Sequence, residues 1–374
     1  MKVVADDKIP FLKGVLEPFA DIVYVNGSKI SSDHLRDADA LLIRTRTICN
    51  EALLKGSGVK FIGTATIGHD HIDTAWCESN GITWKNAPGC NAWSVRQYIT
   101  STLFNLAAIH QFDLSDRVLG VVGVGNVGSK IVRTAELMGM RVYLCDPPKV
   151  RETGACGFIS LKGILRECDI LTFHVPLNRD GEDKTWHMVD AGLLSSVNPG
   201  TIIINSSRGE VADGTALKAA LKSGKISGFV LDVWENEPDI DLELMALCDQ
   251  ATPHIAGYSV DGKATGTAMI IHELSRYFNL PLEKWEATGL PEPDEPVIHI
   301  DCTGLQTHEI IRKAVWHTYD VKADDTRLRS DPALFEKLRG DYPPRREFGA
   351  FTVKLSGPGS AAGMILRKMG FIVI

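Results

Sequence analysis

The chain has 374 residues, of which 44% are hydrophobic and 23% charged, a composition typical of a globular protein with two or three domains. Its net charge of −7 gives no reason to expect a nucleic-acid partner. No apolar run reaches the roughly 20 residues of a membrane-spanning helix, and the acidic N-terminal strand does not resemble a signal peptide. Eight cysteines without a CxxC pair predict no metal site and favour a reducing cytoplasm.

Residues 1–92 alternate short apolar runs with helical stretches. This rhythm predicts a small parallel sheet with helices on both faces, completed by a long helix within residues 258–285. We expect strands at Lys2–Ala5, Ile22–Val25, Ala40–Ile43, Lys60–Gly63 and Ile82–Lys85, and helices at Phe11–Phe19, Ser31–Arg36, Asn50–Leu54 and Ile72–Glu78.

Two loops that follow strands of this segment carry polar side chains. Arg44, Thr45 and Arg46 follow one expected strand, and Thr66 follows the next. Open α/β sheets bind ligands at the carboxyl ends of their strands, and Arg makes bidentate contacts to carboxylate or phosphate. An anionic, oxygen-rich ligand is one interpretation, and a solvated loop is the other. A metal site at the nearby His69 and His71 is not expected, because no further ligand cluster accompanies them.

A glycine-rich turn follows the next expected helix, Trp93–His110. The run from Gly123 through Gly125, Asn126 and Val127 to Gly128 lies between an apolar strand and a stretch with helical spacing, and a second strand then ends at Asp146. This order predicts a dinucleotide site, with the pyrophosphate at the helix N-terminus. Asp146 would bind the ribose hydroxyls and repel a 2′-phosphate, which favours NAD over NADP. A packing turn without a ligand is the alternative.

Six strand-like runs between Val118 and His254 are enough for a full doubly wound domain. Polar residues follow three of them: Arg208 after one, Asp232 and Glu237 around the end of the next, and His254 after the last. At one sheet edge, an Arg, an acid and a His suggest a carboxylate anchor, an orienting acid and a general acid/base. Taken singly, each is more often a surface charge or a satisfied core group.

Beyond a proline-rich and acidic linker at Gly289–Pro296, about 80 residues form a small C-terminal region. We expect its strands at Val297–Ile300, Ala350–Leu355 and Phe371–Ile374, and its helices at Thr307–Tyr319, Pro332–Leu338 and Ser360–Met369.

Long motifs in the second half resemble those of the D-2-hydroxyacid dehydrogenases. The matching stretches are Asn198–Asp213, Leu231–Pro238 and Thr252–Tyr258. The resemblance implies a doubly wound Rossmann NAD-binding domain at residues 93–257 and a flavodoxin-like α/β substrate domain at residues 1–92. It implies an α+β dimerisation domain at residues 286–374, hence a homodimer. A regulatory ligand-binding module is the alternative for this last domain, but its strands fall short of the four-stranded pattern of such modules.

The same resemblance implies a role for each candidate residue. Arg208 would hold the substrate carboxylate, His254 would exchange the proton of the C2 hydroxyl, and Glu237 would orient His254. Asp232 would hold the nicotinamide carboxamide. The remaining implied contacts to NAD are Gly123, Gly125, Asn126, Val127, Gly128, Asp146, Val175, Ser206, Ser207, Arg208 and Gly257. Val175, Ser206 and Ser207 depart from the commonest family residues, which leaves cofactor affinity open.

Other stretches resemble the branch of the family that oxidises a phosphorylated substrate. They are Gly63–Asp73, Ala87–Ala92, Leu144–Pro148, His254–Ser259, Asp261–Ala264, Tyr319–Val321 and Arg345–Glu347. They imply NAD-dependent oxidation of 4-phospho-D-erythronate to the 2-oxo acid, in vitamin B6 synthesis, with Thr45, Thr66 and Tyr258 at the substrate. Arg44 and Arg46 are further candidates for the phosphate, and Arg345 and Arg346 for reaching a partner's active site.

Two rival functions are compatible with the same motifs. One is a sister dehydrogenase for another D-2-hydroxy acid, such as phosphoglycerate. The other is a non-catalytic NAD-sensing protein, which the presence of Arg208, Glu237 and His254 together disfavours.

Overall fold

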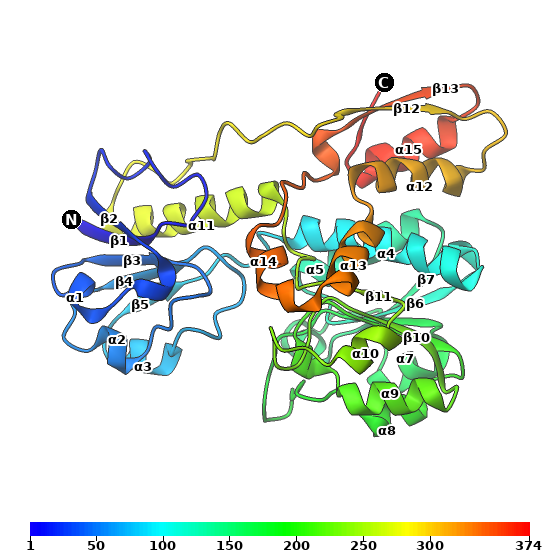
Figure 1. Cartoon of the computed structure of the whole chain (residues 1–374), viewed down its shortest axis with the longest axis horizontal. Coiled ribbons are helices and arrows are strands. Elements are labelled where there is room, and N and C mark those ends of the chain that lie inside the picture. Colours follow the sequence, from blue (N-terminus) through cyan, green and yellow to red (C-terminus); the bar gives the residue numbers. More distant parts are fainter. The chain divides into compact units, whose positions relative to one another are not determined.

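The computed structural model describes all 374 residues (Figure 1). Two compact units make up the chain: residues 1–91 with 259–291, and residues 92–258 with 292–374. None of the helices combines the length and apolar character needed to traverse a bilayer.

The first unit is built on a five-stranded parallel sheet with the order β2-β1-β3-β4-β5. This order is flavodoxin-like, as predicted. Its strands are β1 (Lys2–Asp6), β2 (Asp21–Val25), β3 (Ala40–Ile43), β4 (Phe61–Thr64) and β5 (Thr83–Lys85), and its helices are α1 (Ser32–Leu35), α2 (Glu51–Leu54), α3 (Thr74–Ser79) and α11 (Val260–Phe278), with the short 3₁₀ turn η1 (Gly27–Lys29).

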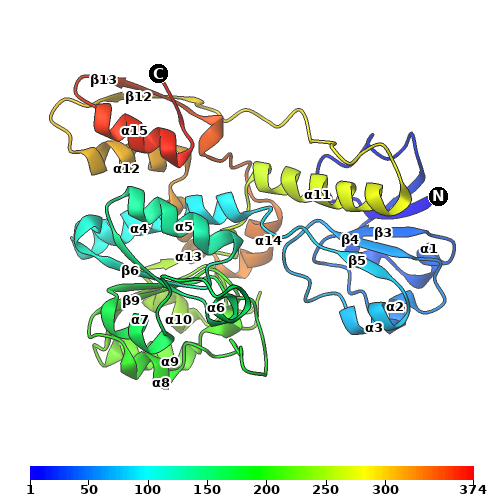
Figure 2. The same ribbon diagram turned by 180° about the vertical axis from the view of Figure 1, so that it is seen from behind.

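Alternate residues along each strand of this unit enter two different cores. Val3, Ala40 and Leu42 pack with Ile270 and other residues of α11 on one face. Val4, Leu41 and Ile43 pack on the other face with Leu35 of α1, Leu54 of α2 and Cys77 of α3. The two-residue period of a strand thus produces the predicted sheet with helices on both faces, as Figures 1 and 2 show.

The predicted helix at Phe11–Phe19 is wrong, because this stretch is a series of turns. Leu12 and Leu16 are fully buried and four residues apart, which mimics a helical period. Gly14 lies between them with φ +86°, a conformation outside the right-handed helical region, and Pro18 follows them. Both leucines reach the core from turns.

The second unit contains a six-stranded parallel sheet with the order β11-β10-β9-β8-β6-β7. Beyond β7, an isolated parallel bridge joins Leu144 to Phe158. In a Rossmann sheet the third strand occupies this position, and here only the bridge marks it. The predicted doubly wound order is therefore present. The strands are β6 (Val118–Val122), β7 (Arg141–Cys145), β8 (Ile170–Phe173), β9 (Thr201–Asn205), β10 (Ile226–Leu231) and β11 (Gln250–Ala251).

Helices cover both faces of this sheet (Figures 1 and 2). On one face lie α4 (Ala92–His110) and α5 (Asn126–Leu137), which contact each other. On the other lie α7 (Leu161–Glu167), α8 (Ala191–Ser196), α9 (Gly214–Lys222) and α10 (Leu242–Leu247), while α6 (Pro147–Thr153) follows β7 directly. The chain reverses direction across the sheet between β6 and β8, where open α/β sheets bind their ligands.

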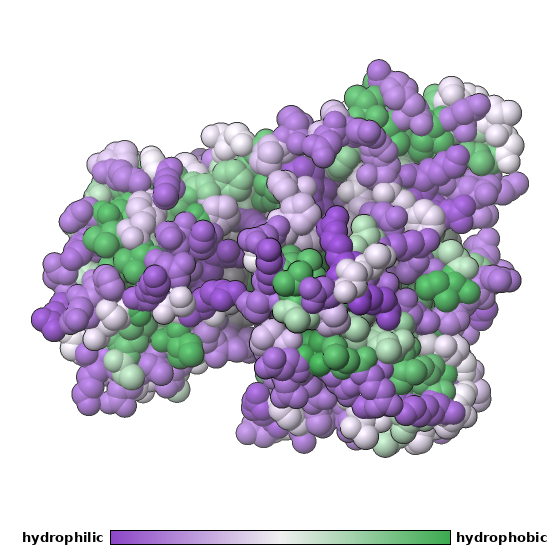
Figure 3. All heavy atoms as spheres, viewed as in Figure 1, coloured by the Kyte–Doolittle hydropathy of each residue, from purple (hydrophilic) through white to green (hydrophobic).

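The C-terminal residues form a three-stranded, wholly parallel sheet of β12 (Val297–Asp301), β13 (Thr352–Ser356) and β14 (Ile372–Val373). The predicted small sheet with helices is confirmed, with helices α12 (Thr307–Thr318) and α15 (Ser360–Met369) on one face. Figure 3 shows exposed hydrophobic surface over this part of the molecule. Three parallel strands also differ from the four-stranded pattern of the regulatory alternative.

Two helices connect β12 and β13 beyond α12. These are α13 (Val321–Ser330), which was not predicted, and α14 (Phe335–Gly340), with the short turn η4 (Pro332–Leu334) between them. Helix α13 buries only Val321, Asp324 and Leu328. Because only two of these are apolar, its sequence shows hardly any apolar stripe. It forms by packing against α4 and β11.

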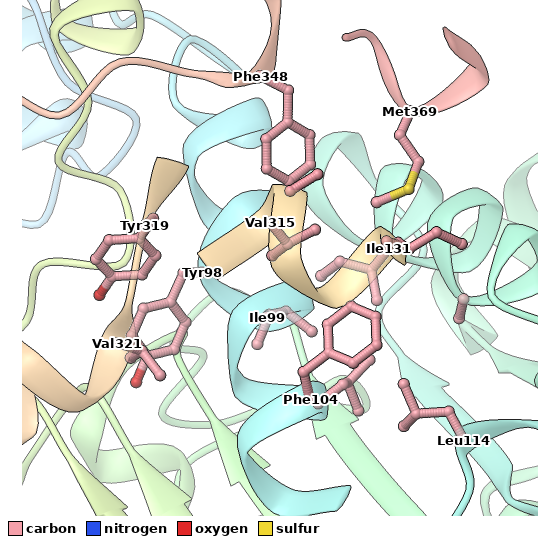
Figure 4. Close-up of a cluster of buried hydrophobic side chains, with 14 of the residues drawn as sticks. Tyr98, Ile99, Phe104, Leu114, Ile131, Val315, Tyr319, Val321, Phe348 and Met369 are labelled. Carbon is pink, nitrogen blue, oxygen red and sulfur yellow. The ribbon is translucent and has the colours of Figure 1, made fainter. Parts of the chain in front are cut away.

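One hydrophobic core joins the C-terminal residues to the Rossmann sheet. In Figure 4, Tyr98 of α4 lies beside Tyr319. The same cluster includes Ile131 of α5, Val315 of α12 and Met369 of α15. Helix α12 contacts α4, and α15 contacts α5. The C-terminal residues are therefore part of the same folded body as the nucleotide-binding sheet.

We expect Phe348→Ala to destabilise this shared core by about 3–5 kcal/mol, the usual effect of truncating a buried Phe. The Phe348 side chain is 1% exposed and stacks on Phe371 at 4.5 Å between ring centroids. Guanidinium unfolding followed by circular dichroism measures the loss. Phe19→Ala, at a 39% exposed ring, is the control, and equal small effects of both variants would contradict the shared core.

Candidate active site

The glycine turn after β6 has three positions with different steric demands. Gly123 has φ +86°, and a Cβ there would lie 2.5 Å from the carbonyl oxygen of His174. A Cβ on Gly128 would lie 2.0 Å from the carbonyl oxygen of Gly123, whereas a Cβ on Gly125 would meet no atom within 4 Å. The outer glycines thus permit the tight turn and the close packing of helix on strand, and the middle one leaves open space.

The first turn of α5 borders that open space. Its N-cap residue is Gly125, so no side chain caps the N-terminal amides. Such amides, together with the helix dipole, form a site for anions.

Asp146 lies beside the same turn at the end of β7. One carboxylate oxygen accepts the Val124 N–H at 2.8 Å, and the other accepts the Lys149 N–H at 3.1 Å. The Lys149 ammonium donates to the carbonyl oxygen of Val124 at 2.7 Å. These bonds hold the acid at the mouth of the turn, as a dinucleotide ribose would require.

Two further predicted cofactor residues line the turn or the neighbouring loop. Val175 follows β8, and its Cγ1 would be 3.0 Å from a Cβ on Gly123. The Ser206 hydroxyl, after β9, is buried without a hydrogen-bond partner, and buried polar groups seldom remain unpaired. An open glycine cradle, an uncapped helix start and an orphaned hydroxyl fit a bound dinucleotide.

Glu237 and His254 form a direct pair. His254 Nδ1 lies 2.7 Å from Glu237 Oε2, and Glu237 Oε1 accepts the Trp234 N–H at 2.9 Å. Burial raises the pKa of Glu237, but the hydrogen bond and charge of His254, the Trp234 N–H and the charge of Arg339 outweigh it and hold that pKa below its usual value. Glu237 is therefore a carboxylate that can orient an imidazole.

Asp232 fixes the loop that carries His254. Its side chain is 1% exposed, and its carboxylate accepts hydrogen bonds from the Thr252 hydroxyl and from the N–H groups of Ile255 and Ala256, at 2.7–2.9 Å. Its own carbonyl oxygen accepts the His254 N–H at 2.7 Å. Burial raises the pKa of Asp232 against the lowering effect of these partners and of His254.

Arg208 lies in the loop after β9, where Nη1 donates to the Ser207 carbonyl oxygen at 2.8 Å. The next residue, Gly209, is held against the neighbouring loop, because a Cβ there would lie 2.0 Å from the carbonyl carbon and oxygen of Trp234. Strands β9, β10 and β11 are adjacent and parallel. The loops that carry Arg208, Glu237 and His254 therefore share one sheet edge, as predicted.

The predicted substrate residues of the first unit lie after β3 and β4. Thr45 is exposed, and Arg44 donates to the Lys8 carbonyl oxygen at 3.3 Å. The Thr66 hydroxyl donates to the Gly68 carbonyl oxygen and lies 2.7 Å from the Thr64 hydroxyl. Because β3 and β4 are paired, both loops occur at one edge of this sheet. Their contacts to substrate stay predictions.

The prediction that Arg345 reaches a partner subunit is wrong. Its side chain is 5% exposed and donates to the Ser94 hydroxyl and to the carbonyl oxygens of Ile255 and Ala256. It therefore supports the loop after His254 within its own chain. Sequence reasoning also missed Arg339, whose Nε donates to the Tyr258 hydroxyl at 3.0 Å.

Comparisons with known proteins agree with this geometry. Residues 92–256 match the family model described as D-isomer specific 2-hydroxyacid dehydrogenase, NAD binding domain. The chain is 48% identical over 357 residues to the erythronate-4-phosphate dehydrogenase of Bacteroides fragilis strain YCH46, covering 95% of this chain and 100% of the relative. This chain belongs to the D-isomer specific 2-hydroxyacid dehydrogenase family. It is an NAD-dependent dehydrogenase.

Further relatives of this dehydrogenase agree in length and fold. The erythronate-4-phosphate dehydrogenase of Porphyromonas gingivalis is 44% identical over 373 residues, the full length of both chains. A crystal structure of D-lactate dehydrogenase from Aquifex aeolicus with NAD and lactic acid superposes with a TM-score of 0.62 at 26% identity, covering 75% of this chain and 96% of that one. Residues 290–370 match a separate domain family of unknown function.

We expect Gly125→Ala to weaken NADH binding about tenfold (~1.4 kcal/mol) without loss of stability, because the added Cβ enters only the open space at the helix start. NADH fluorescence titration and thermal unfolding measure the two quantities. Gly349→Ala is the control, since a Cβ there would make only an ordinary contact, at 3.8 Å. Unchanged NADH affinity in Gly125→Ala would show that the cofactor does not use this cradle.

Proposed function

We propose that this dehydrogenase oxidises 4-phospho-D-erythronate to (R)-3-hydroxy-2-oxo-4-phosphooxybutanoate, a step of pyridoxal 5′-phosphate synthesis. The observation that carries the proposal is the Glu237–His254 pair, 2.7 Å apart, at the sheet edge that also holds Arg208. The full-length relatives named erythronate-4-phosphate dehydrogenase support the substrate.

His254 acts as the general base for the C2 hydroxyl. Its Nδ1 faces Glu237 Oε2, so the ring is oriented with Nε2 available for the substrate proton. As the proton arrives, the ionised Glu237 stabilises the imidazolium that forms. An imidazole suits this task because its ordinary pKa of about 6.5 permits proton transfer in either direction near neutral pH.

Arg208 holds the substrate carboxylate. A guanidinium offers two parallel N–H donors to a carboxylate, which fixes the neighbouring C2 atom in orientation as well as position. Its positive charge also stabilises the negative charge that develops on the C2 oxygen while the proton leaves.

When bound, NAD would supply the acceptor for the hydride that C2 gives up. The pyrophosphate would be held at the start of α5 by Gly123, Gly125, Asn126, Val127 and Gly128. Asp146 would bind the adenosine ribose. Val175, Ser206, Ser207, Arg208 and Gly257 would line the rest of the cofactor, with the orphaned Ser206 hydroxyl gaining a partner. Asp232 would orient the nicotinamide through its carboxamide.

The substrate's hydroxyl and phosphate groups would contact Thr45, Thr66 and Tyr258, with Arg44 as a candidate partner of the phosphate. Such polar contacts discriminate strongly, because a site built for hydrogen bonds leaves groups unpaired when the analogue lacks them.

We expect NADH formation with 4-phosphoerythronate and at least 100-fold lower kcat/KM with unphosphorylated erythronate, about 3 kcal/mol of discrimination. The rate of NADH formation is followed by absorbance at the nicotinamide band, and 3-phosphoglycerate is assayed as a third substrate. Equal activity on the two erythronates would contradict phosphate recognition. Preference for 3-phosphoglycerate would support the sister-enzyme alternative, and NADH binding without turnover of any of them would support the NAD sensor.

We also propose a homodimer formed through the C-terminal domain. Exposed hydrophobic side chains support it. Val297 and Ile372 of the small sheet are 38% and 52% exposed, Ile374 after β14 is 68% exposed, and Met364 of α15 is 58% exposed. Exposed apolar groups of this kind mark interaction surfaces.

Light scattering should give twice the chain mass of 40.9 kDa, and Ile372→Glu should shift the protein toward the monomer, because burying a charge at an interface is costly. Tyr277→Glu, at an exposed aromatic of the first unit, is the control. A monomeric wild-type protein would exclude the dimer.

A further inference from the structure

Arg339 is a cation of the C-terminal residues that lies against the catalytic pair. It belongs to α14, and its Nη1 is 3.8 Å from Glu237 Oε2. Its Nε donates to the Tyr258 hydroxyl at 3.0 Å, and its guanidinium carbon is 5.8 Å from the centre of the Tyr258 ring. The side chain is 20% exposed. One guanidinium thus contacts two residues to which the proposed function gives roles.

Arg339 comes from outside the nucleotide-binding domain. The NAD-binding family model ends at residue 256, and Arg339 lies within residues 290–370, which a separate domain family of unknown function matches. The C-terminal residues therefore do more than extend the shared core, because they bring a fixed positive charge to the residue that orients His254.

We propose that Arg339 is a positioning residue of the active site, which places a permanent positive charge beside the Glu237 carboxylate and anchors Tyr258. The proposal rests on the roles that the proposed function gives to Glu237 and His254.

The distance defines how Arg339 would act on Glu237. At 3.8 Å its Nη1 is too far for a hydrogen bond, so the carboxylate stays free to accept from His254 while it interacts with the guanidinium through space. Both side chains are largely buried, where charges interact more strongly than in water. Because Arg is always protonated, this charge persists at every pH at which an enzyme works.

The same charge opposes protonation of His254. An imidazolium at His254 would share Glu237 with Arg339 and would be repelled by it. Among the other charged groups, Asp232 attracts the imidazolium, and Glu336 lies 3.8 Å from Arg339 Nη1. Arg208 adds a second cation at the same sheet edge. Tyr258 is a further titratable group next to Arg339. Asp232 in turn interacts electrostatically with Tyr98 and Arg345. Arg339 therefore keeps more of His254 in the neutral form that accepts the substrate proton.

Arg345 differs from Arg339 in that its direct contacts are structural. It is more deeply buried and donates to the Ser94 hydroxyl and to two backbone carbonyls, and the carboxylates of Asp324 and Asp232 act on it through space without a direct ion pair. Arg339 instead contacts a titratable pair and a predicted substrate residue. Removal of its charge should alter the pH dependence of the reaction, whereas loss of a structural contact should alter stability.

The test is Arg339→Met, which removes the charge and keeps most of the side-chain volume. We expect folded protein with wild-type NADH affinity, and kcat lowered by about two- to threefold at neutral pH, the loss of neutral imidazole that a shift of about half a pH unit produces. The acidic limb of the kcat profile should move by about half a pH unit or more toward higher pH, because the protonated imidazole is no longer repelled. In Arg339→Lys, which keeps the charge, the acidic limb should return at least in part to its wild-type position.

A readout without substrate separates this proposal from the proposed function. In isotope-labelled protein, the histidine NMR signal that His254→Gln removes should titrate at higher pH in Arg339→Met than in wild type. Arg327→Met is the matched control, since Arg327 pairs with Asp324 in the same segment, and its titration should match wild type. If wild type oxidises no D-2-hydroxy acid, the proposed function is contradicted. The NMR titration needs no substrate and still decides whether Arg339 acts on His254.

Two results would overturn the role of Arg339. One is an NMR titration and a pH profile of Arg339→Met that coincide with those of wild type. The other is a raised KM for the phosphorylated substrate with an unchanged pH profile, which would show that Arg339 acts on substrate binding, directly or through Tyr258, and not on the catalytic pair. If Arg339→Met does not fold, Arg339→Gln and Arg339→Lys are compared in the same way, and equal profiles of the two would contradict a role for the charge.

Discussion

The buried carboxylate of Asp232 is the interaction on which the geometry of the site depends. Three donors from residues 252–256 converge on it, and its own backbone oxygen accepts the His254 N–H. An isolated buried charge is costly, but these bonds compensate for much of that cost. They join the loops after β10 and β11 and hold His254 at φ +55°, a conformation that non-glycine residues seldom adopt. The position of the imidazole is thus set by backbone, before Glu237 orients its ring.

Close backbone approaches complete this rigid edge. Gly209 lies against the Trp234 carbonyl group, and Gly128 against that of Gly123, with no space for a Cβ in either place. Such contacts leave little freedom to the loops that carry Arg208 and Glu237. The arrangement suits hydride transfer, because small misplacements of reacting groups reduce its rate greatly.

Much of the fold and the site could be predicted because the signals are local in the sequence. Strand runs, the glycine turn, Asp146 and the polar residues after strands all lie in short motifs, and the rule for sheet edges brings Arg208, Glu237 and His254 together. The helix expected at Phe11–Phe19 failed because buried leucines in turns imitate a helical period. Helix α13 was missed because tertiary packing, and not its own apolar pattern, stabilises it.

The contribution of the C-terminal residues could not be predicted for a different reason. Arg339 and Arg345 are two of several arginines in residues 327–346, and nothing adjacent in the sequence distinguishes them. Their partners lie about 80 residues or more earlier in the chain, except for Tyr319, Tyr342 and Glu336. The Arg345 guanidinium leaves Nε and Nη1 without hydrogen bonds, a cost that its position over the rings of Tyr319 and Tyr342 offsets in part. Because these contacts run from the small C-terminal region to the loop after His254, that region cannot separate from the Rossmann sheet without releasing the catalytic loop.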